Sequence, residues 1–76
     1  MRFIVDPQDH EPRHVHGLSG EAVVIVNIGI DGNVSLADRP DSIRPGNAKR
    51  SEVRRILRSA ARNSDELVIF WEKMHA

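Results

Sequence analysis

Three of the four histidines lie within seven residues near the start of the chain. They are His10, His14 and His16, and Asp9 and Glu11 flank the first of them. If the segment holding the last two is an extended strand, both imidazoles point to the same side, with Cα atoms roughly 6–7 Å apart. The two rings can then converge on one ion or one substrate, and His10, Asp9 or Glu11 can supply a third group.

This histidine run is compatible with three roles. Imidazole and carboxylate groups bind divalent ions such as zinc, nickel or copper, so His10, His14 and His16 form a candidate metal site. Without any cofactor, His14 and His16 can instead act as catalytic acid and base, with His10 as an orienting group, because histidine titrates near neutral pH. In the third role the rings are structural and hydrogen-bond to the loop backbone. The spacing leaves these alternatives open, and with them whether the protein is an enzyme.

A second candidate surface is a row of arginines spaced four residues apart, which places them on one face of a helix. Its members are Arg50, Arg54, Arg58 and Arg62. Such rows contact phosphates, so we predict that these arginines bind nucleic acid. If the histidines form the active site of a metal-independent ribonuclease, Arg54 and Arg58 would hold the phosphate of its substrate. The chain has only three aromatic residues, too few for a base-stacking platform. The alternative is a solvated helix face whose arginine stems cover apolar surface.

Length and composition predict one domain spanning residues 1–76, without disulfides or thiolate metal sites because cysteine is absent. Residues 1–38 carry two arginines and six acids, which gives −4, and residues 39–76 carry nine basic and five acidic residues, which gives +4. This asymmetry either steers an anionic partner to one face or lets the two halves attract each other. The longest apolar stretch is too short to span a bilayer and no signal peptide is evident, so we expect a cytoplasmic protein without membrane contact.

The first half of the chain predicts strands. Phe, Ile and Val in residues 2–5 favour a short first strand, and residues 14–16 are expected to form a second one, followed by a turn at 17–20. The alternating run 21–30 favours a longer, central strand. Asp31 and Gly32 form a hairpin signal. A type I turn with Gly32 as a left-handed bulge residue pairs Gly29 with Asn33, and this register keeps the apolar residues of both strands on one face.

The second half predicts helices. Prolines and glycine in residues 38–47 indicate a loop without helix or strand. Apolar residues at helical spacing then predict an amphipathic helix (Val53, Ile56, Leu57, Ala60, Ala61) and a second, C-terminal helix with its own apolar stripe (Leu67, Phe70, Trp71, Met74). We therefore expect an α+β fold, with a small antiparallel sheet of three or four strands and two C-terminal helices packed on one face.

Residues 9–16 read Asp-His-Glu-Pro-Arg-His-Val-His. They resemble the Asp-His-Asn-Pro-Pro-His-Phe-His motif of bacterial domain-of-unknown-function family 4160. Residues 20–22 are similar to that family's Tyr-Glu-Ala strand, residues 30–34 to its Thr-Gly-Glu-Val turn, and residues 63–67 with Trp71 to its His-Arg-Asp-Glu-Leu segment and following tryptophan. Departures from the family pattern are Arg13 in place of proline, Val15 in place of phenylalanine and Gly17 in place of alanine.

The resemblance implies a function. Family members are small bacterial proteins, often encoded beside a second small domain, and the pair is suspected of forming a toxin–antitoxin module. By this resemblance we expect the chain to be the toxin component with a small antitoxin-like protein as its partner, and His10, His14 and His16 fall on the family's recurrent histidines. If the protein is catalytic, we expect RNA cleavage, with His14 and His16 as the acid–base pair and His10 as an orienting group. The alternative is a non-catalytic module that binds a protein or, through its histidines, a divalent metal such as zinc or nickel. A homo-oligomer is a further open alternative.

Overall fold

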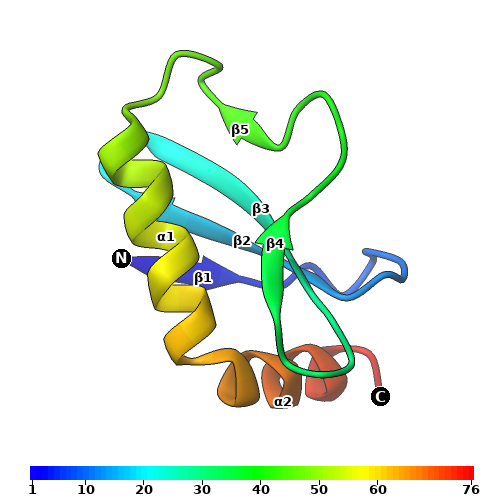
Figure 1. Ribbon diagram of the computed structural model, residues 1–76. Coiled ribbons are helices and arrows are strands. Elements are labelled where there is room, and N and C mark those ends of the chain that lie inside the picture. Colours follow the sequence, from blue (N-terminus) through cyan, green and yellow to red (C-terminus); the bar gives the residue numbers. More distant parts are fainter.

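Five strands and then two helices follow one another along the chain in the computed structural model, which describes all residues 1–76 (Figure 1). Their bounds are β1 (Arg2–Ile4), β2 (His14–Ser19), β3 (Ala22–Ile28), β4 (Val34–Leu36), β5 (Ile43–Arg44), α1 (Arg50–Arg62) and α2 (Ser64–Met74). The strands form one antiparallel sheet in the order β1-β2-β3-β4, and β5 also pairs with β3. The predicted α+β fold is therefore confirmed. No helix is both long enough and apolar enough to span a membrane.

The hairpin between β3 and β4 has the predicted register. Ile28 pairs with Val34 and Val26 with Leu36. The Gly29 amide donates to the Asn33 carbonyl at 2.8 Å, and Gly32 has a φ of 84°, which requires a residue without a Cβ. The bulge therefore keeps Val34 and Leu36 on the same face as Ile28 and Val26, where Val34 packs against the core and Leu36 stays exposed.

Strand β5 corrects the prediction that residues 38–47 hold no strand. Ile43 and Arg44 pair with Val24 and Val23, and the Ile25 amide donates to the Ser42 carbonyl at 2.8 Å. The physical reason is that β3 extends beyond the short β4 and leaves backbone groups at its edge that the loop can satisfy. The prolines shorten the strand to two residues but do not prevent it.

The turn predicted at 17–20 is also wrong, because β2 continues to Ser19 and the chain turns at Gly20 and Glu21. Gly17 lies inside β2, directly beneath Ile56 of α1. A Cβ at this position would overlap the Ile56 side chain and would lie 3.0 Å from the Phe3 ring. Gly17 thus allows close approach of helix and sheet, and is not a turn residue.

The core lies between the sheet and the helices. Its fully buried members are Val15, Val24, Val26, Ile56 and Ala60, and α2 adds Leu67 and Trp71. The apolar faces predicted for the two helices are only partly buried. Ala61 is exposed, and 36% of the surface of Phe70 and 37% of that of Met74 is accessible to solvent. Helix α1 covers one face of the sheet, whereas α2 lies across the end of the core near the start of β2 (Figure 1).

Alternation along β2 divides its side chains between two faces. Val15 belongs to the core, Gly17 meets α1, and Ser19 donates a hydrogen bond to Glu52 of α1. His14 and His16 therefore point to the opposite face, which α1 does not cover.

Candidate functional site: a histidine–carboxylate cluster

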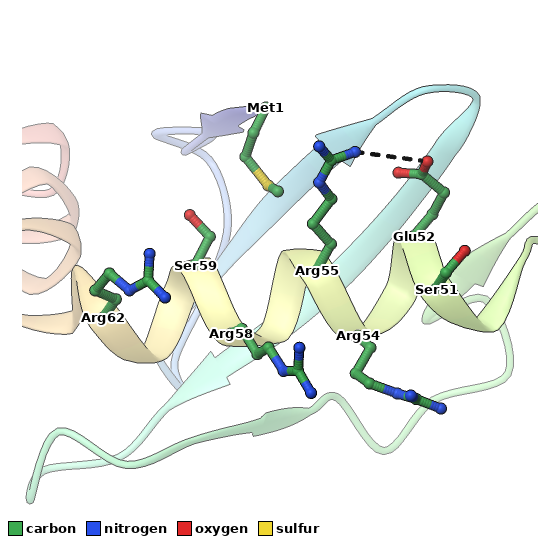
Figure 2. Close-up of a pocket in the computed structure, with 8 residues that line it drawn as sticks. All are labelled: Met1, Ser51, Glu52, Arg54, Arg55, Arg58, Ser59 and Arg62. Atoms are coloured by element: carbon green, nitrogen blue, oxygen red, sulfur yellow. Dashed lines mark ion pairs between the residues drawn. The ribbon is translucent and has the colours of Figure 1, made fainter.

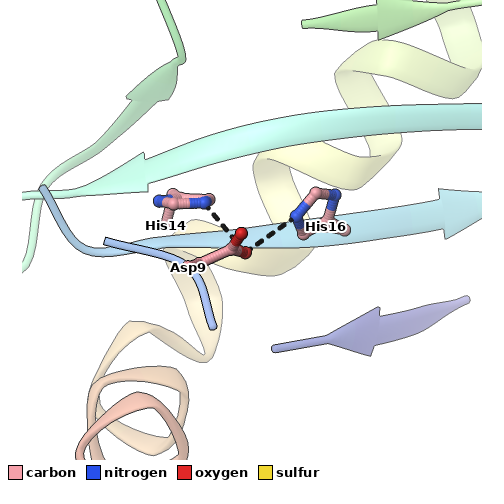
Figure 3. A group of neighbouring side chains, drawn as sticks. All are labelled: Asp9, His14 and His16. Carbon is pink, nitrogen blue, oxygen red and sulfur yellow. Dashed lines mark hydrogen bonds and ion pairs between the residues drawn. The ribbon is translucent and has the colours of Figure 1, made fainter. Parts of the chain in front are cut away.

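Asp9, His14 and His16 bring three potential metal ligands together on the face of the sheet away from α1 (Figure 3). Oδ2 of Asp9 lies 3.0 Å from Nε2 of His14 and 3.2 Å from Nε2 of His16. All three donor atoms lie within 4.8 Å of one another. One carboxylate oxygen therefore stands between two imidazole nitrogens.

His14 is the buried member of the cluster, with 8% of its side chain exposed. Its Nδ1 lies 2.8 Å from the Pro12 carbonyl oxygen, which can only accept a hydrogen bond. We therefore assign the proton of the neutral ring to Nδ1, which leaves a lone pair on Nε2. Although Nε2 lies 3.0 Å from Asp9, the angles do not make a hydrogen bond, and this buried nitrogen has no hydrogen-bond partner.

His16 and Asp9 are the accessible members, with 24% and 25% of their side chains exposed. The His16 Nε2 hydrogen-bonds to the Asp9 carboxylate at 3.2 Å, and the rings of His14 and His16 are 5.7 Å apart. A ligand can therefore reach the cluster from the side of His16 while His14 forms its floor.

Local structure explains how Asp9 reaches the strand. The Gln8 amide donates to the Asp6 carboxylate and the Asp9 amide to the Asp6 carbonyl, so the chain turns immediately after β1. Because Ile4 pairs with His16, this turn lies beside the start of β2. Asp9 was one of three residues that the sequence offered as a third group, and the structure selects it.

His10 and Glu11, the other two, are exposed and do not belong to the convergent group. Both line a hollow next to the cluster, here called the histidine-side hollow. Its other lining residues are Gln8, Asp9, Pro12, His14, Asn27, Ala37, Asp38 and Arg39. His10 therefore lies close enough to border a ligand at the cluster, but it is not one of the three groups that meet.

The C-terminal end of α2 supports the cluster through Trp71 and through His75, which directly follows the helix. Trp71, predicted as a core anchor, is buried with its ring 5.3 Å from that of His14, and His75 stacks on Trp71 at 3.7 Å. Nδ1 of His75 lies 2.9 Å from the Trp71 carbonyl and Nε2 lies 2.8 Å from the Asp9 carbonyl. His75 thus connects the last turn of α2 to the backbone of a cluster residue.

The predicted nucleic-acid contacts lie elsewhere. Arg50, Arg54, Arg58 and Arg62 are exposed on α1, and the last three line a different hollow that contains none of the histidines (Figure 2). Because α1 packs on the face of β2 opposite to His14 and His16, the sheet separates the two groups. The structure does not bring the arginines and the histidines into one site.

Comparison of the chain with protein-family models, with curated proteins and with solved structures finds no match. The similarity to family 4160, and the toxin–antitoxin role that it implies, stay predictions from the sequence.

Proposed function

We propose that this protein binds a divalent transition-metal ion through Asp9, His14 and His16. The observation that carries the proposal is the Nε2 atom of His14, which is buried, lacks a hydrogen-bond partner and lies beside a carboxylate oxygen. A buried acceptor without a partner costs on the order of 1–3 kcal/mol. A cation between the nitrogen and the carboxylate would remove that cost, and His16 would coordinate the same ion.

Distances within the cluster suit a small ion. Bonds of about 2.0–2.2 Å to nitrogen and oxygen place tetrahedral ligands about 3.3–3.6 Å from one another. The two nitrogen–oxygen separations are 3.0 and 3.2 Å. The remaining separation, between the two imidazoles, is at most 4.8 Å, and rotation of the more exposed His16 ring would shorten it.

The second hydrogen bond of His14 also matches this role. Histidine ligands usually donate their other N–H to a carbonyl or carboxylate, which fixes the ring and its tautomer. The bond from Nδ1 of His14 to the Pro12 carbonyl does this. It leaves Nε2 as the free ligand atom on the side of Asp9.

Two nitrogens and one oxygen favour zinc, nickel or copper over magnesium and calcium, which prefer oxygen ligands. Three protein ligands leave at least one coordination position for water or a substrate, as in catalytic rather than structural zinc sites. The histidine-side hollow, which Asp9 and His14 line, offers space for such a molecule beside two of the three ligands. The site is therefore better suited to binding a further molecule than to a purely structural ion.

Isothermal titration calorimetry with Zn²⁺ and Ni²⁺ tests the proposal. We expect one ion per chain for the wild type, loss of that binding in a His14→Ala, His16→Ala double variant, and at least a tenfold weaker binding in Asp9→Asn. His10→Ala is the matched control and should bind as the wild type does. No binding by the wild type, or equal binding by the double variant, would refute the metal site.

Acid–base catalysis is a second candidate, and the Asp9–His16 pair favours it. A carboxylate 3.2 Å from an accessible imidazole holds the ring in a fixed orientation, as a general base requires. This is the chemistry of the metal-independent ribonuclease that the histidines and arginines of the sequence predict for a toxin. Arg39 lines the same hollow as His14 and would replace Arg54 and Arg58 as the phosphate contact.

Expression of the chain alone tests this second candidate. The toxin version predicts growth arrest that a His16→Ala variant relieves, and RNA cleavage by purified protein that continues in EDTA. Cleavage that stops in EDTA and returns with zinc would assign the same residues to the metal instead. Normal growth together with intact RNA would exclude the toxin version.

A further inference from the structure

Helix α1 presents a concentrated positive charge on its outer side. The helix contains five arginines and a single acid, Glu52. Four of the arginines line one shallow hollow and are here called the arginine strip: Arg54, Arg55, Arg58 and Arg62 (Figure 2). The hollow also contains Met1.

Most of this charge is not neutralised within the chain. Glu52 accepts a hydrogen bond from Ser19 and pairs with Arg55 at 3.8 Å. No acidic group lies within ion-pair distance of the other three arginines of the strip. By contrast, Arg13 and Arg39, which lie elsewhere in the chain, each form an ion pair with an acidic side chain. Repulsion among these neighbours opposes folding, so an anion bound across the strip would stabilise the helix.

The spacing of the arginines indicates an extended anion. Arg54, Arg58 and Arg62 are four residues apart, which at about 1.5 Å per residue gives steps of about 6 Å and a length of about 12 Å for the strip. Each strand of a nucleic-acid duplex carries about one phosphate per 3.4 Å of axis, so the strip spans about four phosphates. A single small anion would engage only one step of such a row.

The composition of the hollow distinguishes between two kinds of extended partner. Protein interfaces depend on a few large apolar or aromatic anchors at their centre. Met1 is the only apolar residue among the eight that line this hollow. Phosphate contacts need no such anchor, because they depend on charge and hydrogen bonds.

We propose that the arginine strip binds the phosphate backbone of a nucleic acid without reading its sequence. No aromatic residue lines the strip, and Trp71 is buried against His14 and His75, so bases have nothing to stack on. The arginine strip and the histidine–carboxylate cluster lie on opposite sides of the sheet. The inference therefore does not depend on the proposed metal site.

Fluorescence anisotropy with three labelled probes tests this inference: single-stranded RNA, duplex RNA and duplex DNA, each 20 nucleotides per strand and of two unrelated sequences. Four phosphate contacts predict a slope of log affinity against log salt concentration of about −2.8 for a single strand and about −3.6 for duplex DNA. Binding should therefore weaken about 50- to 150-fold between 50 and 200 mM salt. The two sequences should bind within about twofold of each other, since phosphates carry no sequence information.

Charge-matched variants make the test specific to the strip. The double variant Arg54→Ala, Arg58→Ala should reduce the steepness of the salt dependence by about 1.4–1.8. The control double variant Arg44→Ala, Lys73→Ala removes two exposed charges outside the hollow and should leave the salt dependence unchanged. All four positions are exposed, and circular dichroism would check that both variants stay folded. Absence of binding to every probe at 50 mM salt, equal loss in both double variants, or binding of a polyglutamate peptide in place of the nucleic acids would overturn the inference.

Discussion

Replacing Gly17 by alanine tests the packing that separates the two candidate surfaces. Gly17 lies where α1 approaches β2 most closely, and an added Cβ would overlap Ile56, which is fully buried, and lie 3.0 Å from Phe3. Ile56 cannot move outward without loss of its core contacts. Overpacking of this kind costs about 1–3 kcal/mol.

In a domain of this size each kcal/mol changes the melting temperature by about 4–8 °C, so Gly17→Ala should lower it by at least about 4 °C. Thermal unfolding followed by circular dichroism measures the change. Gly46→Ala is the control, since an added Cβ there meets nothing within 4 Å, and its effect should stay within about 0.5 kcal/mol. An unchanged melting temperature for Gly17→Ala would mean that α1 does not pack on β2 as described.

Two further predictions concern Trp71 and His75, which contact the histidine–carboxylate cluster from the C-terminal end of the chain. His75→Ala removes the hydrogen bond to the Asp9 carbonyl. Because His75 holds a metal ligand in place but does not bind the ion itself, the variant should bind zinc about tenfold more weakly in calorimetry and should not lose binding altogether. An unchanged zinc affinity would exclude this role. Trp71 is the single tryptophan, with its ring 5.3 Å from that of His14, so bound Cu²⁺ or Ni²⁺ should quench its fluorescence in the wild type. In His14→Ala the same titration should leave the fluorescence unchanged, and equal quenching there would place the ion elsewhere.

Local signals explain which parts of the fold the sequence predicts. The β3–β4 register follows from Gly32 and from the alternation on either side of it, and both act within a few residues. Strand β5 and the position of Gly17 depend on distant partners, the free edge of β3 and the side chain of Ile56. Neither partner is visible in a window of neighbouring residues.

The same distinction applies to the site. The convergence of His14 and His16 follows from strand alternation, but the choice of Asp9 over His10 or Glu11 depends on the path of an irregular loop. His75 lies 66 residues from Asp9, and no spacing pattern connects the two. The arginine row is a local helical feature, whereas its separation from the histidines depends on which face of β2 meets α1.

The central claim is that one ion binds His14, His16 and Asp9 together, and the nitrogen resonances of the imidazoles test it most directly. In long-range ¹⁵N–¹H spectra of the ion-free protein, neutral His14 should show its proton on Nδ1. One equivalent of Zn²⁺ should then shift the Nε2 signals of His14 and His16 and leave those of His10 unchanged. Unchanged signals from His14 and His16, or a shift confined to His10, would contradict the site.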